Sequence, residues 1–187
     1  MTSTDSARDP GRPSGRHSRG PATVLGRPLL DWVGLIARLV LGIALVAAGA
    51  LKVGKPLVSA RAVQAYQIFP FEVAAYIGYA LPVVEIIVGA LLVVGLFTRA
   101  AAAVGTLLMI AFVIGIASAW ARGLTIDCGC FGGGGQIGAE QTQYPQEIAR
   151  DVLFALCGAW LVWRPRSAFA LDTRLSPTPA PSGSGQN

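Results

Sequence analysis

Two cysteines separated by a single glycine, Cys128-Gly129-Cys130, are the residues of this chain best suited to chemistry. The glycine lacks the Cβ that would hinder one sulfur from turning toward the other. A disulfide across so short a loop is strained, and strain makes such a bond easier to reduce. The spacing therefore favours exchange with a partner thiol over a permanent cross-link.

Three other interpretations of the pair stay open: a structural staple, a metal site and two inert thiols. A metal would find only two soft ligands here, since the one histidine, His17, lies in the polar N-terminal segment. We therefore expect no metal. The third cysteine, Cys157, lies within an apolar run, where a cysteine usually serves as a small packing residue.

The charges near the pair bear on its reactivity, because the thiolate is the reactive species. Arg122 would favour a thiolate, whereas Asp127, next to Cys128, would oppose it. No residue stands out as a general base. We expect Arg150 and Asp151 to act at the start of a helix, where a carboxylate gains about 0.3–1 kcal/mol from the helix dipole.

A second group of candidates consists of charges inside apolar runs. Glu85 lies twelve residues from each end of the run 73–97, at about the middle of a bilayer, where a lone carboxylate is costly. We expect an intramembrane charge pair of Arg38 with Glu85, acting as a structural link or as a proton or quinone site. Lys52, at the end of the first run, is expected to extend to the membrane interface.

The composition of the chain indicates a polytopic membrane protein. Of its 187 residues 53% are hydrophobic and 13% are charged, which leaves too little polar surface for a soluble globule and excludes a cytosolic enzyme or a disordered chain. The net charge is +5, yet most basic residues flank apolar runs and form no stripe with aromatics. This pattern is typical of membrane topology and argues against a nucleic-acid partner.

Four apolar runs predict an all-α integral membrane protein with four transmembrane helices, at about 32–52, 73–97, 100–120 and 145–164. The last is the weakest, because it contains Arg150 and Asp151, but a start at Pro145 gives a helix of about 31 Å. The membrane domain is then 29–166. Residues 1–28 and 167–187, rich in Ser, Pro and Gly, are predicted to be disordered tails.

Basic residues predict a multi-pass protein of the cell membrane with both termini in the cytoplasm. This orientation leaves nine Lys and Arg residues inside and five outside. The loops 52–72 and 121–147, the second of which carries the cysteines, then lie outside. Ala48-Gly49-Ala50 resembles a signal-peptidase site, but the long polar segment before it and Arg38 favour a retained span.

Several of these residues resemble the DoxX superfamily of four-helix membrane bundles. They are Arg38, Gly42, Gly49 and Lys52 in the first span, Glu85 and Gly89 in the second, and the segment Gly95-Leu96-Phe97-Thr98-Arg99. With the Cys-Gly-Cys-Phe-Gly loop the chain is most similar to the MauE branch, over residues 32–165. The resemblance implies a role beside thiol- or sulfur-linked quinone oxidoreductases, or in maturing a disulfide-rich extracytoplasmic protein with a thioredoxin-like partner.

Two hypotheses follow. In the first, a membrane redox protein exchanges electrons between Cys128 and Cys130 and an extracytoplasmic thioredoxin-like or disulfide-rich partner. It would be a subunit of a thiol/quinone oxidoreductase system with quinone as the membrane-side acceptor, although no cofactor motif is evident. In the second, a non-enzymatic membrane subunit or small transporter uses Arg38 and Glu85 for protons or packing, and the cysteines form a structural disulfide. The lipid bilayer is a partner in both.

Overall fold

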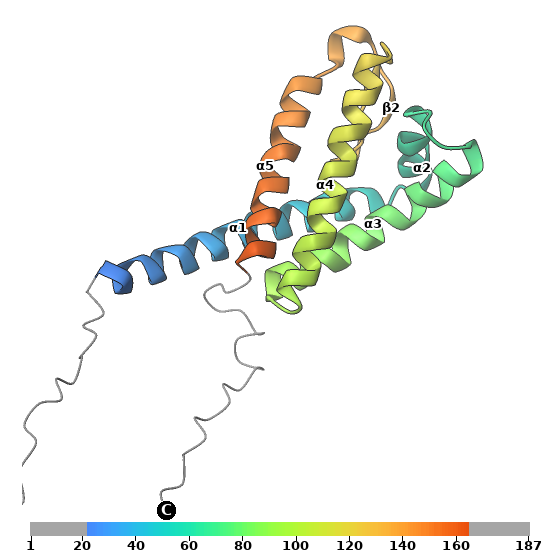
Figure 1. The fold of residues 1–187 in the computed structure, drawn as a ribbon. Helices are drawn as coiled ribbons and strands as arrows, with labels where there is room; N and C mark the ends of the chain where they lie inside the picture. Colours follow the sequence, from blue (N-terminus) through green and yellow to red (C-terminus); the bar gives the residue numbers. More distant parts are fainter. Residues whose placement is uncertain (1–21, 165–187) are drawn as a thin grey trace, which may run out of the picture.

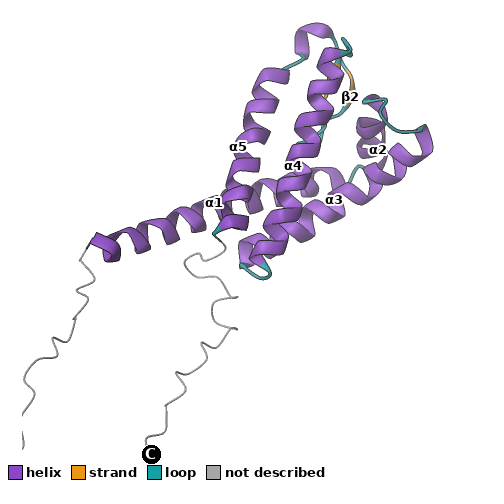
Figure 2. Ribbon diagram, viewed as in Figure 1, coloured by secondary structure: helices purple, strands orange, loops and turns teal. Residues whose placement is uncertain are grey.

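The computed structural model describes residues 22–164, with side chains from residue 29 onward. Helices make up most of this part (Figures 1 and 2). They are α1 (Ala22–Val53), α2 (Pro56–Ala65), α3 (Phe71–Val94), α4 (Thr98–Ala121) and α5 (Tyr144–Trp163). Between α4 and α5 lie two short strands, β1 (Ile126–Asp127) and β2 (Gly135–Gln136), and a 3-10 helix, η1 (Ala139–Gln141).

The long helices form two antiparallel pairs that cross each other. Helices α1 and α3 pack along one another, and α4 and α5 form the second pair (Figure 1). Contacts of α1 with α5 and of α3 with α4 join the pairs, while the short α2 packs on α3 and against β2. The α4–α5 connection, which contains the cysteine pair, therefore sits at one end of the bundle above α2.

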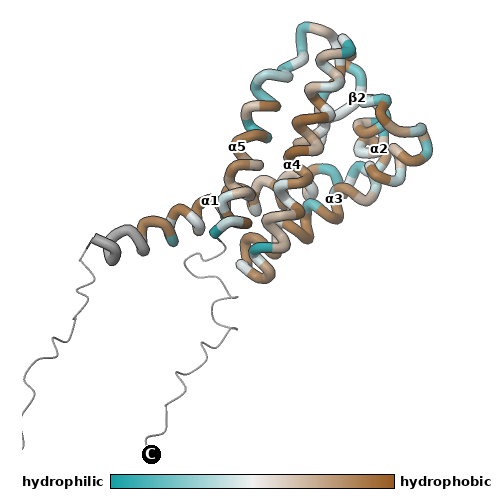
Figure 3. Tube along the Cα trace, viewed as in Figure 1, coloured by the Kyte–Doolittle hydropathy of each residue, from teal (hydrophilic) through white to brown (hydrophobic). Residues whose placement is uncertain are grey.

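Three helices in the described residues are long and apolar enough to cross a membrane: Leu29–Val53, Phe71–Val94 and Thr98–Ala121. The first three predicted spans, 32–52, 73–97 and 100–120, coincide with these candidate spans to within a few residues at each end. The hydropathy colouring shows long hydrophobic stretches on these helices and hydrophilic residues in the α4–α5 connection (Figure 3).

The fourth predicted span, 145–164, is only partly supported. Helix α5 forms over these residues and packs along α4, but it is not apolar enough to count with the other three. Its first two turns carry Glu147, Arg150 and Asp151, and this cluster of charge lowers the hydropathy of a helix only 20 residues long.

Two boundaries differ from the prediction. Helix α1 begins at Ala22, so residues 22–28, expected in the disordered arm, are helical. The loop expected over 52–72 contains α2, which has Pro56 in its first turn, a favoured position for proline. Helix α2 has only 10 residues, too few to span a membrane, so a pattern of long apolar runs does not reveal it. The rest of the predicted arm, 1–21, and the predicted tail, 167–187, lie outside the described residues.

Close contact between α1 and α3 depends on small residues. A Cβ on Gly89 would lie 2.7 Å from the carbonyl oxygen of Gly42, and one on Gly49 would lie 2.6 Å from that of Pro82. No side chain fits at these distances, so the two backbones approach as they do in other membrane helix pairs. The contacts also fix the register of the pair: Gly42 faces Gly89, and Gly49 faces the turn from Pro82 to Glu85.

A separate hydrophobic cluster anchors the α4–α5 connection. Ile116 and Ala119 at the end of α4 pack with Ile126 of β1 and Tyr144 of α5, all buried. The hydroxyl of Tyr144 donates to the carbonyl oxygen of Leu124 at 2.6 Å and accepts from the amide of Ile126 at 2.9 Å. These bonds hold the chain immediately before the cysteines against the start of α5.

Candidate functional site

The cysteine pair lies in a folded turn at the end of β1. Strands β1 and β2 pair antiparallel, with Ile126 opposite Gln136 and Asp127 opposite Gly135. The amide of Gly129 donates to Oδ1 of Asp127 at 2.9 Å, and Gly129 has a φ of 71°, which favours glycine. Asp127, expected to oppose a thiolate at Cys128, therefore shapes the turn.

The turn packs closely on α2. A Cβ on Gly129 would lie 2.7 Å from Cβ of Ala62, so only glycine fits between the two cysteines. The hydroxyl of Tyr66, just after α2, donates to the carbonyl oxygen of Cys128 at 3.0 Å. Burial raises the pKa of the Tyr66 phenol, which keeps the hydroxyl protonated as a donor. Sequence reasoning misses Tyr66, because no sequence pattern connects this residue to Cys128, which lies 62 residues later.

The two thiols have different surroundings. The three cysteines of the chain are free thiols in this structure; Cys128 is partly exposed and Cys130 is 5% exposed. The amide of Cys130 donates to Sγ of Cys128 at 3.3 Å, so the two residues fold back on each other. Cys128 is therefore the thiol that a partner protein can reach.

Helix α5 supplies the charged groups beside the thiols. Nη2 of Arg150 lies 3.9 Å from Sγ of Cys128, and Nε of the same side chain donates to Oδ1 of Asp151 at 3.0 Å. The other oxygen of Asp151, Oδ2, lies 3.8 Å from Sγ of Cys130. Arg150 and Asp151, expected only to stabilise the start of a helix, thus contact both thiols.

Arg150, and not Arg122, is the cation at the cysteines. The guanidinium of Arg122 donates to the backbone carbonyl oxygens of Tyr66 and Gln67, where it holds the chain that follows α2. The guanidinium of Arg150 lies 4.8 Å from the ring centre of Phe131, which keeps it near Cys128. Sequence distance pointed to Arg122, whereas the return of the chain as α5 brings Arg150 to the site.

The surroundings of Cys130 disfavour its ionised form. A hydrogen bond with Cys128, burial and the charge of Asp151 raise the pKa of the Cys130 thiol, while Arg150 acts in the opposite direction. Cys130 is thus protonated at neutral pH and needs a proton acceptor before it can react.

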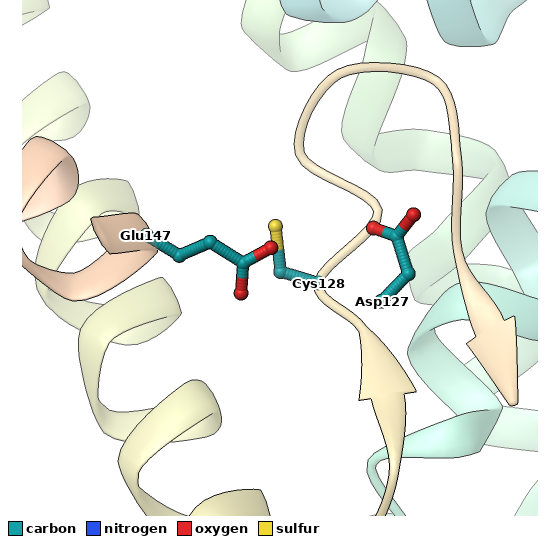
Figure 4. Close-up of side chains that lie close together, drawn as sticks. All are labelled: Asp127, Cys128 and Glu147. Carbon is teal, nitrogen blue, oxygen red and sulfur yellow. The ribbon is translucent and has the colours of Figure 1, made fainter. Parts of the chain in front are cut away.

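A second carboxylate reaches the site from the same helix. Glu147 extends from the first turn of α5 toward Sγ of Cys128, while the carboxylate of Asp127 lies on the other side, toward the turn (Figure 4). One ligand atom from each of these three residues lies within 4.8 Å of the others. One thiol with two carboxylates, one of them engaged by Gly129, does not resemble the nitrogen and sulfur sets of structural zinc sites. We therefore assign no metal to this cluster.

The buried ion pair of the bundle joins Glu85 to Lys52, whereas the sequence predicts a pair of Glu85 with Arg38. Nζ of Lys52 lies 2.7 and 3.0 Å from the two carboxylate oxygens of Glu85, and the two residues are 4% and 0% exposed. The carboxylate that was expected to bind Arg38 is held by Lys52, which was expected to extend to the interface. In the α1–α3 register, Arg38 lies about ten residues, or about 15 Å, along the axis from the level of Glu85.

A small cavity separates the ion pair from the buried thiol. Its lining includes Glu85 from α3, Cys130 and Phe131 from the loop, and Asp151 from α5. The volume of about 10 Å³ is about that of one water-sized sphere. The ion pair and the cysteine site are therefore neighbours, although they are far apart in sequence. Cys157 lies away from both and packs against the main hydrophobic core, as predicted.

Comparison with known proteins gives one family match and no individual relative. No curated protein and no solved structure matches the chain. Residues 30–164 match the family described as methylamine utilisation protein MauE. The matched residues cover the three candidate membrane spans except for Leu29, and they include the cysteine loop and α5. The chain is therefore a membrane protein of the MauE family.

Proposed function

We propose that this membrane protein exchanges thiols and disulfides through Cys128 and Cys130 with a thioredoxin-like or disulfide-rich protein outside the cytoplasm. One observation carries the proposal: Cys128 is partly exposed beside Arg150, whereas Cys130 is buried beside Asp151. Exchange benefits from this difference, because one thiol must meet the partner and the other must react only after the mixed disulfide has formed.

The reaction begins when the thiolate of Cys128 attacks one sulfur of the partner's disulfide. A bond forms between Cys128 and that sulfur, the partner's S–S bond breaks, and its other sulfur leaves as a thiolate. The thiolate of Cys130 then attacks Sγ of Cys128, which releases the partner's first sulfur and closes the Cys128–Cys130 disulfide. Two electrons pass from the pair to the partner, and the same steps run backward when the partner is the reductant.

Arg150 has a clear role in the first step. Its guanidinium lies close to Sγ of Cys128 and is fixed from the other side by Asp151. A cation beside a partly exposed thiol favours the thiolate that must attack. The partner's disulfide is the oxidant in this sequence, so the exchange needs no bound cofactor. A quinone in the bilayer is the candidate for a further, membrane-side acceptor.

We also propose the orientation with both termini in the cytoplasm and α5 as a fourth span. The packing of α5 along α4 supports this, as does the clustering of its charges in the two turns next to the cysteine loop. These turns would lie at the outer end of the bundle, away from the middle of the bilayer, where charged groups cost less. Disulfides also persist outside the cytoplasm.

A non-enzymatic membrane subunit or small transporter is the second candidate, with the cysteines as a structural disulfide. The buried Lys52–Glu85 pair favours it, because ionisable residues within the membrane often mark a proton or ion path. The two candidates differ in what the cysteines contribute. If the cysteines form a structural disulfide, loss of one cysteine lowers the stability of the protein. There is then no exchange reaction for the substitution to affect.

A single-turnover assay separates the candidates. The reduced full-length protein in detergent is mixed with the oxidised form of a strongly oxidising thioredoxin-fold protein, and the new thiols of this partner are counted. We expect Cys128→Ser to give no new thiol and Cys130→Ser to stop at the mixed disulfide, with one new thiol per partner instead of two. Both should show little change in melting temperature, because so short a loop gains little from closure. Cys157→Ala, the matched control, keeps the activity. Unchanged activity in both serine variants, or a large fall in their melting temperature, would instead support the second candidate, in which the cysteines form a structural disulfide.

A further inference from the structure

Glu147 and Asp151 are four residues apart, so they lie one above the other on one face of α5. That face is turned toward the cysteine loop. Oδ2 of Asp151 lies 3.8 Å from Sγ of Cys130, and a carboxylate oxygen of Glu147 lies within 4.8 Å of Sγ of Cys128. Figure 4 shows the Glu147 side chain extending toward that sulfur. Each thiol of the pair therefore has a carboxylate of its own.

The two carboxylates are not accounted for by structural roles alone. Asp151 is 2% exposed, and Arg150 binds its Oδ1 and leaves Oδ2 facing Cys130. Oε2 of Glu147 is buried and has no hydrogen-bond partner within residues 29–164. Burying an acceptor without a partner is unfavourable. Both oxygens are thus available to accept a proton from a neighbouring thiol.

The chemistry of exchange requires two acceptors. Closing the Cys128–Cys130 disulfide removes one proton from each thiol, and the two sulfurs that leave the partner take up one proton each. Cys130 is buried against an apolar cavity, so bulk water cannot readily accept its proton. Its charged neighbours are Asp151 and Arg150, and of these only Asp151 can accept one.

We infer that Glu147 and Asp151 are the two proton-transfer residues of the site, Glu147 serving Cys128 and Asp151 serving Cys130. The inference rests on the proposed thiol–disulfide exchange. Glu147 takes the proton of Cys128 to form the thiolate that attacks the partner, and Asp151 takes the proton of Cys130 to form the thiolate that attacks Cys128. Each carboxylic acid then returns its proton to a departing sulfur. In the reverse direction the same two groups act first as acids.

The assignment predicts that the two variants slow different steps. In a rapid-quench experiment, the reduced full-length protein is mixed with the same strongly oxidising thioredoxin-fold protein in its oxidised form, and mixed and completed disulfides are separated by electrophoresis. Glu147→Gln should slow formation of the mixed disulfide by about 10²-fold and leave its resolution unchanged. Asp151→Asn keeps an amide oxygen that can accept from Nε of Arg150, so it should form the mixed disulfide at close to the wild-type rate. It should resolve the mixed disulfide about 10²-fold more slowly, so that this species accumulates. Glu140→Gln, which alters an exposed carboxyl of η1, is the control.

A further variant keeps the assignment testable. Asp151→Asn leaves Arg150 without its carboxylate and can impair folding, so Asp151→Glu is measured as well. This variant keeps an acid near Cys130 and should resolve the mixed disulfide faster than Asp151→Asn. Wild-type rates for both steps in the Gln and Asn variants, or an equal slowing of both steps, would overturn the assignment and leave the exchange itself standing. Absence of any mixed disulfide in the wild type would overturn the proposed function too.

Discussion

At the scale of single residues, the cysteines differ because different elements surround them. Cys128 faces Arg150 and Glu147 and is partly exposed, while Cys130 lies under the loop beside Asp151. The identity of the pair could be predicted from sequence because a Cys-Gly-Cys triplet is a local signal. Its charged neighbours could not, because they come from α5, which returns to the loop after about 20 residues. The one available hint is the four-residue spacing of Glu147 and Asp151 at a helix start.

The Cys130 thiol should titrate at higher pH than an ordinary thiol. Interaction with Cys128, burial and the charge of Asp151 raise the pKa of Cys130, so its thiolate forms only above the ordinary thiol range of about 8.5. We expect part of the thiolate absorbance of the Cys157→Ala protein to appear only above that range. Replacing Cys128 with Ser removes the largest cause of the shift, so the remaining Cys130 step should move to lower pH. Identical titration of Cys130 in both proteins would contradict this description.

At the scale of helices, the sequence predicts the three long apolar helices that are candidate membrane spans, but not which residues of these helices face each other. Hydropathy places the three apolar helices, because lipid exposure requires long apolar runs. The α1–α3 register depends on the contacts of Gly42, Gly49 and Gly89, and no count of residues from the ends of a span reveals it. For this reason the sequence predicts that Glu85 pairs with Arg38, which lies at another level of the bundle. It does not predict the pair with Lys52.

The Lys52–Glu85 pair should be the most sensitive polar contact of the bundle. Removing one partner leaves a buried, uncompensated charge, which typically costs about 3–5 kcal/mol. We expect Glu85→Ala and Lys52→Ala each to lower the thermal stability and the amount of folded protein. The double variant should be less impaired than the two losses added together, because no lone charge remains.

Two controls test the identity of the partner. Glu72→Ala changes an exposed carboxyl in the first turn of α3 and should have little effect. Adding Arg38→Ala to Glu85→Ala should give no rescue, because Lys52 would still be unpaired. A rescue by Arg38→Ala, measured by thermal melting of the purified protein, would mean that Arg38 and not Lys52 balances Glu85.

At the scale of the whole molecule, the bundle presents the cysteine loop at one end and the α3–α4 turn at the other (Figure 1). Both termini of the membrane domain then lie on the side away from the loop under the proposed four-span topology. A membrane-impermeant thiol reagent should label Cys128 in intact cells after mild reduction, because this thiol is partly exposed. Cys157, packed against the hydrophobic core, should stay unlabelled. Labelling of Cys128 only after the cells are permeabilised would reverse the topology.

The central claim is that Cys128 attacks a partner disulfide and Cys130 resolves the product. Non-reducing electrophoresis of membranes tests it most directly, in two variants that both carry Cys157→Ala. Cys130→Ser should accumulate a mixed disulfide between Cys128 and a thioredoxin-like or disulfide-rich protein, because the resolving thiol is gone. Cys128→Ser should accumulate none, because Cys130 is buried. Equal trapping by the two variants would contradict the assigned order of the thiols, and no trapping by either one would contradict exchange itself.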